Sequence, residues 1–519
     1  MDKIKILWAD DEIDMLKPQL MFLNQKGYDV TTVTNGHDAL DECNGPEDFD
    51  VVFLDESMPG ISGLETLSKI KEKHPLLPVV MITKNEAENL MEEAIGSQIT
   101  DYLIKPVNPN QILLTLKKII DNTRLVREKT SSDYQQEFRQ ILMEINSRLD
   151  HKQWVDIYKK IINWELKLDA SRTEQMSEIL AMQKTEANAE FSKFIIDNYA
   201  DWMSQIGDQD VPIFSPHVFR NWVFPKLDKK PTVFLLLDNF RFDQWKVLEP
   251  LFSRLFRIVE EDHFYSILPT STQYSRNSIF AGMMPLGISK QFPQWWKNDN
   301  EEGGKNNHES DLLAKQIQRF VRKDIKHEYF KITNTTLAKQ LNDNILNSLT
   351  NDLTVIVYNF IDTLSHARTE MEVIKELASD ETAYRSLTKS WFEHSALFSA
   401  LEKIADKDIR LIVTTDHGTI RVKQPCKVVG DRETTPNLRY KLGRNLNYDK
   451  KDVLAIREPE KVGLPKINLS SSYIFAREDK YFLYPNNYNY YNNYYRDTFQ
   501  HGGISLEEMI CPILMLESK

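Results

Sequence analysis

The stretch Leu411–Gly418 (LIVTTDHG) decides the fold of the larger part of the chain. It is apolar at nearly every position before Asp416, which is typical of a strand buried on both faces of a parallel sheet. Asp416 and His417 lie at its carboxyl end, where open α/β sheets bind their ligands. Adjacent strand residues point to opposite faces, so the two side chains converge only if the chain turns, and Gly418 permits a turn. A carboxylate beside an imidazole suits Zn²⁺, although such a strand end can also simply cap the next loop.

Two more apolar runs in this half of the chain end in acidic residues. Pro231–Leu237 is followed by Asp238, and Leu353–Phe360 is followed by Asp362 and His366. A late His501 in QHGG precedes a last predicted strand at Met509–Leu516. The segment ILPTSTQYSRNSIFAG (residues 267–282) presents three hydroxyl residues before a helical pattern. Such a hydroxyl caps a helix or, beside a metal, acts as a nucleophile.

Length and composition limit the class of protein. A chain of 519 residues predicts two to four domains. No apolar run approaches the roughly 20 residues that span a bilayer, and the N-terminus has no signal-peptide pattern. The three cysteines show no metal or redox spacing, which fits a reducing cytoplasm. A net charge of −12 argues against broad binding to duplex nucleic acid, although it leaves room for a local basic groove.

Residues 3–120 alternate strand-like runs with helical patterns, which predicts a doubly wound parallel sheet. The predicted strands are residues 3–9, 29–34, 50–55, 78–83 and 101–105. Asp10, Asp11 and Asp55 follow two of these strands, and Thr83 and Lys105 end two others. Carboxylates that converge at one sheet edge need a cation, and Mg²⁺ suits them. Helix capping would explain one or two of these residues, but not the full set.

This segment resembles a response-regulator receiver, because D-D, D-x-x-M-P-G, T and Y-x-x-K-P occur in order. By that resemblance, Asp55 is the phosphoacceptor, and Asp10, Asp11, Asp55 and the carbonyl of Ser57 hold Mg²⁺. Thr83 and Tyr102 form the switch pair, and Lys105 contacts the acyl phosphate. The resemblance also implies a sensor histidine kinase as partner and homodimerisation on phosphorylation.

Residues 121–205 contain no proline, and their apolar residues recur at helical spacing. The pattern predicts amphipathic helices that form a small bundle or bind a partner helix. No DNA-binding output module is visible, since the segment is not basic.

The C-terminal half resembles the alkaline-phosphatase superfamily, most closely its PglZ branch, because the family order of residues is present and Thr435–Asn445 looks like a PglZ signature. By that resemblance, one zinc ion is held by Asp238, Asp416 and His417, and a second by Asp362, His366 and His501. Thr272, the second Thr of a P-T-x-T-like segment, lies between the ions as a further zinc ligand and is the nucleophile of a phosphodiesterase. Asn239 and Ser275–Asn277 depart from the phosphodiesterase pattern, which leaves the substrate open.

Several basic or polar residues are candidates for holding a nucleotide phosphate, although each could equally lie in a solvated loop. They are Arg276, Asn277, Arg432, Arg439, Lys441 and Arg444. Two inserts look less informative: 297–310 is expected to be a flexible polar loop, and Tyr484–Tyr495 is expected to be a packed loop or a surface on which bases stack.

Receiver, helical segment and PglZ-like domain together are similar to the PorX-type response regulators, which are associated with type IX secretion. We therefore expect an α/β protein with a flavodoxin-like receiver (1–122), a central helical bundle (123–208) and an alkaline-phosphatase-like α/β domain (209–519). The expected function is a cytoplasmic two-component regulator, without membrane insertion, whose output is a di-zinc phosphodiesterase for nucleotides or oligonucleotides. The alternative is a phosphorylation-switched scaffold that binds a sigma factor or a secretion-system component and uses the metal only for structure or ligand binding.

Overall fold

The chain divides into two compact units in the computed structural model. One comprises residues 1–135 with 170–174, and the other residues 136–169 with 175–519. The structure describes residues 4–45, 48–75, 77–84, 99–171, 174–227, 230–321, 323–378 and 380–519. None of the helices in these ranges is long and apolar enough to cross a lipid bilayer.

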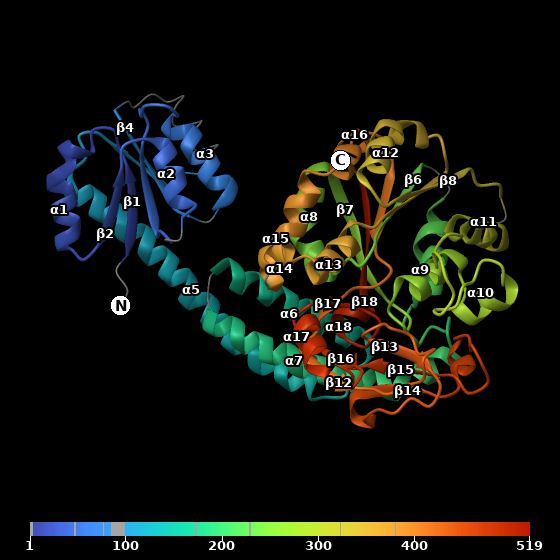
Figure 1. The fold of residues 1–519 in the computed structure, drawn as a ribbon. Helices are drawn as coiled ribbons and strands as arrows, with labels where there is room; N and C mark the ends of the chain where they lie inside the picture. Colours follow the sequence, from blue (N-terminus) through green and yellow to red (C-terminus); the bar gives the residue numbers. More distant parts are fainter. Residues whose placement is uncertain are drawn as a thin grey trace. The chain divides into compact units, whose positions relative to one another are not determined.

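The first unit contains a five-stranded parallel sheet in the order β2-β1-β3-β4-β5 (Figure 1). Two apolar cores cover its faces, one around Trp8 and Phe53 and the other around Leu54 and Leu67. This order and the buried faces confirm the predicted doubly wound receiver fold. Its elements are β1 (Lys5–Ala9), α1 (Lys17–Gln25), β2 (Asp29–Val33), α2 (Gly36–Cys43), β3 (Val51–Asp55), α3 (Gly63–Lys73), β4 (Val79–Thr83) and β5 (Asp101–Ile104).

Three long helices follow: α5 (Pro109–Ile145), α6 (His151–Ser171) and α7 (Glu174–Ser204). Helix α5 is continuous through residue 122, where the sequence suggested a domain boundary. The predicted apolar stripes of α6 and α7 pack on one another, with Trp154 against Phe191 at 5.5 Å between ring centroids, and also on the C-terminal domain. Tyr158 of α6 packs edge-on against Phe242 at 6.3 Å between ring centroids, and Phe191 of α7 packs against Tyr265 at 6.3 Å. Helices α6 and α7 therefore share a core with the C-terminal domain.

The C-terminal domain is built on a six-stranded sheet in the order β7-β18-β10-β6-β9-β8. Strands β10, β6, β9 and β8 are parallel, while β18 runs antiparallel to both of its neighbours. The central strands are buried along their whole length because helices cover both faces of the sheet (Figure 1). The strands are β6 (Thr232–Leu237), β7 (Phe256–Tyr265), β8 (His327–Ile332), β9 (Leu353–Tyr358), β10 (Arg410–Thr414) and β18 (Ile510–Ser518).

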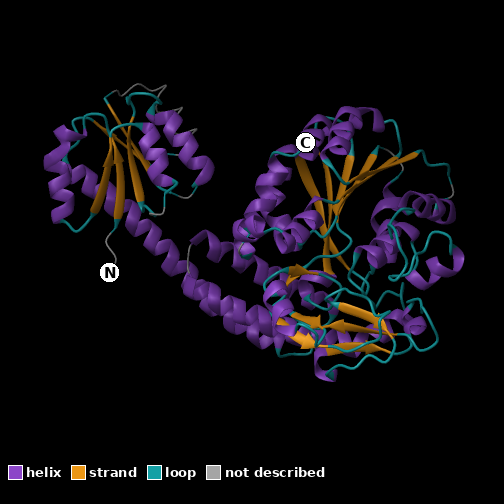
Figure 2. Ribbon diagram, viewed as in Figure 1, coloured by secondary structure: helices purple, strands orange, loops and turns teal. Residues whose placement is uncertain are grey.

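In the sequence, the helices of this domain alternate with those strands. They are α8 (Phe242–Leu255), α9 (Thr272–Ala281), α10 (Pro285–Gln291), α11 (Glu309–Phe320), α12 (Thr335–Ser348), α13 (Phe360–Glu370), α14 (Glu372–Leu377), α15 (Glu381–Glu393), α16 (Ala396–Ile404), α17 (Tyr488–Tyr495) and α18 (Leu506–Met509). Smaller sheets lie beyond one end of the main sheet (Figure 2). They are formed by β11 (Ile420–Arg421), β12 (Gln424–Lys427), β13 (Tyr440–Gly443), β14 (Val453–Ile456), β15 (Ser472–Ala476), β16 (Lys480–Leu483) and β17 (Phe499–Gln500).

Both inserts differ from the expectation. The segment after Trp296 is anchored, because the Asp299 carboxylate accepts hydrogen bonds from the hydroxyls of Tyr274 (2.5 Å) and Tyr440 (2.9 Å). Asn306 adds a bond from its side-chain amide to the Thr272 carbonyl at 3.0 Å. Within the Tyr/Asn segment, residues Tyr488–Tyr495 form the helix α17 rather than a loop, and residue Tyr490 is 65% exposed.

Candidate active site

The three parallel strands β6, β9 and β10 end at the same edge of the main sheet, and the predicted ligands gather there. Asp238 directly follows β6, Asp416 and His417 follow β10, and Asp362 lies in the first turn of α13 after β9. Burial of these strands on both faces fixes where each chain leaves the sheet. The acidic residues that follow the buried strands in the sequence therefore lie together in one cluster of side chains.

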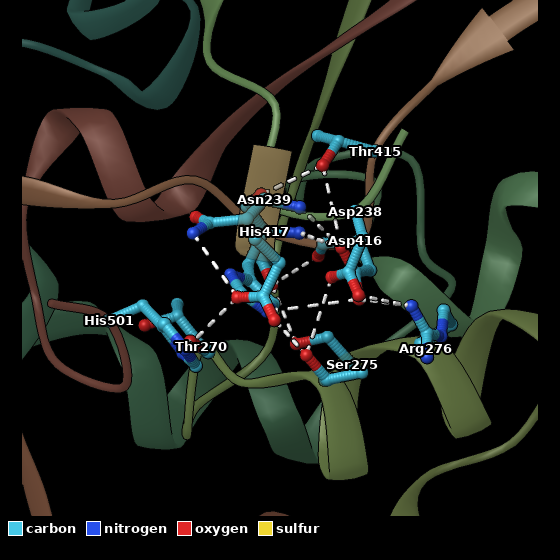
Figure 3. A network of polar contacts seen from close by, with 12 residues as sticks. Asp238, Asn239, Thr270, Ser275, Arg276, Thr415, Asp416, His417 and His501 are labelled. Atoms are coloured by element: carbon cyan, nitrogen blue, oxygen red, sulfur yellow. Dashed lines mark hydrogen bonds and ion pairs between the residues drawn. The ribbon is translucent and has the colours of Figure 1, made fainter. Parts of the chain in front are cut away.

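The cluster consists of two groups of three side chains whose ligand atoms lie within 4.8 Å of one another inside each group. One group is Asp238, Asp416 and His417, all of them buried; the other is Asp362, His366 and His501. The groups adjoin, because the rings of His417 and His501 stack at 4.3 Å between centroids (Figure 3). The structure therefore brings together the six carboxylate and imidazole ligands that the sequence suggested for two metal ions.

The two stacked histidines are oriented by backbone carbonyls. Nδ1 of His417 lies 3.0 Å from the Gly418 oxygen, and Nδ1 of His501 lies 3.2 Å from the Thr270 oxygen. A carbonyl only accepts, so each Nδ1 carries a proton, and Nε2 is the ring atom that remains to face a ligand. Burial and the neighbouring His417 and His366 hold the pKa of His501 well below its usual value, which keeps this ring neutral.

Charge and hydrogen bonding at the first group fit a metal ion. Burial and the nearby Asp238 raise the pKa of Asp416 to about 7, and Oδ2 of Asp416 has no hydrogen-bond partner among the described residues. Burial and Asp238 likewise raise the pKa of Asp362 to about 6. Buried carboxylates that repel one another, together with imidazole nitrogens, are the donor set of a zinc site. The residues present thus fit the ions that the sequence suggested.

Thr272 is the first residue of α9 and faces the first group. Its Oγ1 lies 3.1 Å from Nε2 of His417 and 3.4 Å from Oδ1 of Asp238. The preceding Ser271 is the N-cap, so Thr272 stands at the positive end of the helix dipole. The hydroxyl is therefore placed against two ligand atoms and in a field that favours an anion.

Asn239 explains one departure from the phosphodiesterase pattern. Its φ of 65° lies in the left-handed region, which asparagine tolerates better than most residues other than glycine. Its backbone N–H donates to Asp416 (3.3 Å), and its side-chain amide donates to Asp362 (3.4 Å) and Ser365 (3.2 Å). Asn239 thus connects the two groups of ligands, a role that the sequence alone did not indicate.

Gly418 serves a different purpose from the one that the sequence suggested. Its φ is outside the left-handed region, so the turn does not need glycine for its dihedral angles. Instead, a Cβ at this position would lie 2.0 Å from the backbone oxygen of Glu507. Glycine is required here because another backbone segment approaches closely.

Four of the residues proposed to bind a phosphate are buried and bonded to other groups of the protein. Arg276 is buried, and its guanidinium binds Asp238 (2.7 Å) and Glu309 (2.5 Å), so it balances charge beneath the site. Through this contact Arg276, together with His417, holds the pKa of Asp238 below its usual value against the upward effect of burial. Arg439 is buried in an ion pair with Glu508 at 2.6 Å.

The other two are buried as well. The Asn277 amide donates to the carbonyls of Gln273 (2.8 Å) and Lys305 (3.1 Å), and Lys441 donates to the Thr435 carbonyl (3.0 Å). Exposed polar residues and buried ones look alike in a single sequence, so the burial of these four side chains could not be predicted from it. Arg432 is exposed, and Arg444 lies partly exposed beside Asp431 and Glu433; for these two, phosphate binding stays a prediction.

The receiver has its own cluster. Ligand oxygens of Asp10, Asp11 and Asp55 lie within 4.8 Å of one another. Nζ of Lys105 lies 2.9 Å from Asp10 and 3.0 Å from Asp55. Burial raises the pKa of Asp55 against the opposing effect of Lys105, while Asp10 adds to the rise. These oxygens suit Mg²⁺.

The remaining receiver residues lie in the neighbouring loops and strands. The Thr83 hydroxyl donates to Glu56, Tyr102 is 41% exposed, and Ser57 follows Asp55 by two positions in the loop after β3. The switch pair and the carbonyl of Ser57 stay predictions.

Comparison with known proteins agrees with this arrangement. Residues 6–117 match the model of the response regulator receiver domain, and residues 124–203 match that of the PorX response regulator linker domain. Residues 218–516 match the BREX system PglZ alkaline phosphatase-like domain. Together these matches define the PorX-type architecture of a response regulator with an alkaline-phosphatase-like output domain. Since the last match spans more than half of the chain, the protein belongs to the PglZ family.

Similar proteins of known sequence match in the receiver. The transcriptional regulatory protein ZraR of Klebsiella oxytoca is 35% identical over 24% of this chain and 28% of its own length. The transcriptional regulatory protein ResD of Bacillus subtilis is 30% identical over 23% of this chain and 49% of its own length. The chain thus spans less than a third of the first relative and about half of the second. A CheY-like receiver domain protein from Methanospirillum hungatei, whose structure is solved, is 25% identical and covers 23% of this chain and 96% of its own, with a TM-score of 0.23.

Proposed function

We propose that the protein is a two-component response regulator whose PglZ domain is a di-zinc phosphodiesterase acting on nucleotides or oligonucleotides. One observation carries the proposal: the Thr272 hydroxyl faces His417 (3.1 Å) and Asp238 (3.4 Å) beside two adjoining sets of metal-ligating side chains. A domain that only bound a metal would not need a hydroxyl at that point.

One zinc ion would take Asp238, Asp416 and His417, and the other Asp362, His366 and His501. When bound, two such ions stabilise the attacking and leaving oxygens of an in-line displacement. Thr272 supplies the attacking oxygen: its Oγ–P bond forms while the P–O bond to the leaving group breaks, and the Thr272 proton is released. Water then hydrolyses the phosphothreonine and restores the hydroxyl. The N-terminus of α9 favours the charge of the phosphoryl group.

The receiver provides the control. Phosphorylation of Asp55 by a sensor histidine kinase, with Mg²⁺ held by Asp10, Asp11 and Asp55, adds charge and acceptor oxygens next to Lys105. We expect the phosphorylated protein to form a homodimer in the cytoplasm. The three buried cysteines, all of them free, fit that compartment. The PorX-type architecture motivates a link to type IX secretion.

The test is hydrolysis of bis-p-nitrophenyl phosphate and p-nitrophenyl phosphate by zinc-loaded protein. Thr272→Ala should lower kcat for the diester by at least about a thousand-fold, since the attacking oxygen is gone. Thr336→Ala, which changes an exposed threonine on α12, is the matched control. Bound zinc is measured in all three proteins, so that loss of metal is not mistaken for loss of the nucleophile.

Equal diesterase activity in wild type and Thr272→Ala, or none in either with zinc bound, would refute the enzyme. The protein would then be a phosphorylation-switched scaffold for a sigma factor or a secretion-system component.

A further inference from the structure

A chain of buried ion pairs joins α6 to the domain that carries the metal ligands. Arg385 of α15 lies at its centre and is 3% exposed. Its Nη1 lies 3.3 Å from Glu165 and 3.0 Å from Asp243, and its Nη2 lies 2.5 Å from Asp169. Glu165 and Asp169 are one helical turn apart on α6, while Asp243 is in the first turn of α8. The guanidinium therefore ties the helical segment to the catalytic domain.

The chain continues from Asp243 to the turn after β10. Both oxygens of Asp243 also accept hydrogen bonds from Arg241, at 2.9 and 2.6 Å. A third nitrogen of Arg241 lies 3.4 Å from the backbone oxygen of Thr419, two residues after His417. The Arg241 side chain also packs on Gly418, since a Cβ there would lie 3.3 Å from its Cγ. Arg241 thus contacts the very turn that presents Asp416 and His417.

A second connection starts from α7. The Asn188 amide donates to Glu507 at 3.0 Å, and its oxygen accepts from the N–H of Leu506 at 2.8 Å. Lys184 pairs with Glu507 at 3.2 Å and with Glu165 at 3.3 Å. The backbone oxygen of Glu507 is the nearest atom that a Cβ on Gly418 would meet, at 2.0 Å. Both helices therefore reach the same turn by separate contacts.

The contacts surround a cavity of about 300 Å³ lined by Glu165, Lys184, Arg385 and Glu507, among others. A volume of that size holds roughly ten water molecules, so the helices are not tightly packed against the domain there. Charged groups removed from water are costly unless each keeps its partner. Around this pocket the polar contacts therefore hold α6 and α7 against the turn, whereas the apolar core that the helices share with the domain holds them elsewhere.

We propose that Arg385 and Glu507 are positioning residues through which α6 and α7 fix the Asp416–His417 turn, so that the helical segment controls zinc affinity and turnover. This inference rests on the proposed zinc site. It gives the helical segment, which follows the receiver in the sequence, a direct route to the metal ligands. A contiguous set of contacts does not by itself prove that two sites are energetically coupled, so the coupling has to be measured.

The test removes charge from α6 without changing the catalytic domain. Glu165→Gln with Asp169→Asn should weaken zinc binding about 10- to 100-fold in chelator competition, and should lower kcat while KM stays unchanged. Asp156→Asn, at an exposed carboxylate on the same helix, is the control and should match the wild type. Zinc affinity reports on positioning even if the wild type hydrolyses no diester, so failure of the proposed function would be recognised separately.

A second variant covers the case in which the first does not fold. Asn188→Ala removes the two hydrogen bonds between the Asn188 amide and residues Leu506 and Glu507, and should weaken zinc binding several-fold. Zinc affinity within twofold of the wild type in a folded variant, in either test, would overturn the proposal and leave the network a purely structural feature. Circular dichroism establishes that each variant is folded.

Discussion

Replacing Gly418 by alanine tests whether the close approach of the Glu507 backbone positions the turn that carries Asp416 and His417. The added Cβ would lie 2.0 Å from the Glu507 oxygen, which is 1.0 Å inside the 3.0 Å limit that real Cβ atoms respect. The obstacle is backbone and cannot rotate away, so the turn or the Glu507 segment must move. Overpacking of this kind costs about 3 kcal/mol, and in a unit of this size such a loss lowers the melting temperature by roughly 4 °C. A displaced turn also misplaces Asp416 and His417.

The assay combines thermal unfolding of the metal-free protein with zinc binding by chelator competition. We expect Gly418→Ala to lower the melting temperature and to weaken zinc binding about 10- to 100-fold. Gly287→Ala is the matched control: its Cβ would meet only the flexible Met283 side chain at 3.3 Å, inside the helix α10. Alanine is the better helix former, so the control should be neutral or slightly stabilising. A Gly418→Ala protein that melts and binds zinc like the wild type would refute the close-approach argument.

Two further predictions concern the receiver and a buried lysine. Beryllofluoride, a mimic of the phosphoryl group, should double the mass of the wild type in light scattering and leave Asp55→Asn unchanged; no mass change in the wild type would contradict phosphorylation-driven dimerisation. Burial lowers the pKa of Lys441 from 10.5 to about 7. Between these values the unfolded chain binds the proton and the folded one does not, so stability should rise with pH, by at most about 1.4 kcal/mol per unit. Urea unfolding at pH 7 and pH 9 should show this rise in the wild type and a smaller one in Lys441→Met; equal slopes would contradict the argument.

The sequence alone indicated the receiver sheet, the central buried strands of the larger sheet and the set of candidate ligands. Buried parallel strands are continuous apolar runs, so β1, β3, β6, β9 and β10 are visible in the sequence, and so are the polar residues that follow them. Strand ends meet at one edge in every doubly wound sheet, which is why Asp238, Asp362 and Asp416 could be grouped before any coordinates were known.

Only the tertiary structure decided what surrounds those ligands. Arg276 and Arg439 are ordinary polar residues in the sequence, and only folding places them in buried ion pairs with Asp238 and Glu508. Gly418 needs its small size because of Glu507, which is 89 residues away in the chain. Contacts between distant segments leave no periodic trace in a sequence. Local patterns therefore fix the elements and the residues at their ends, whereas the packing of those elements decides which side chains meet a substrate and which support the site from beneath.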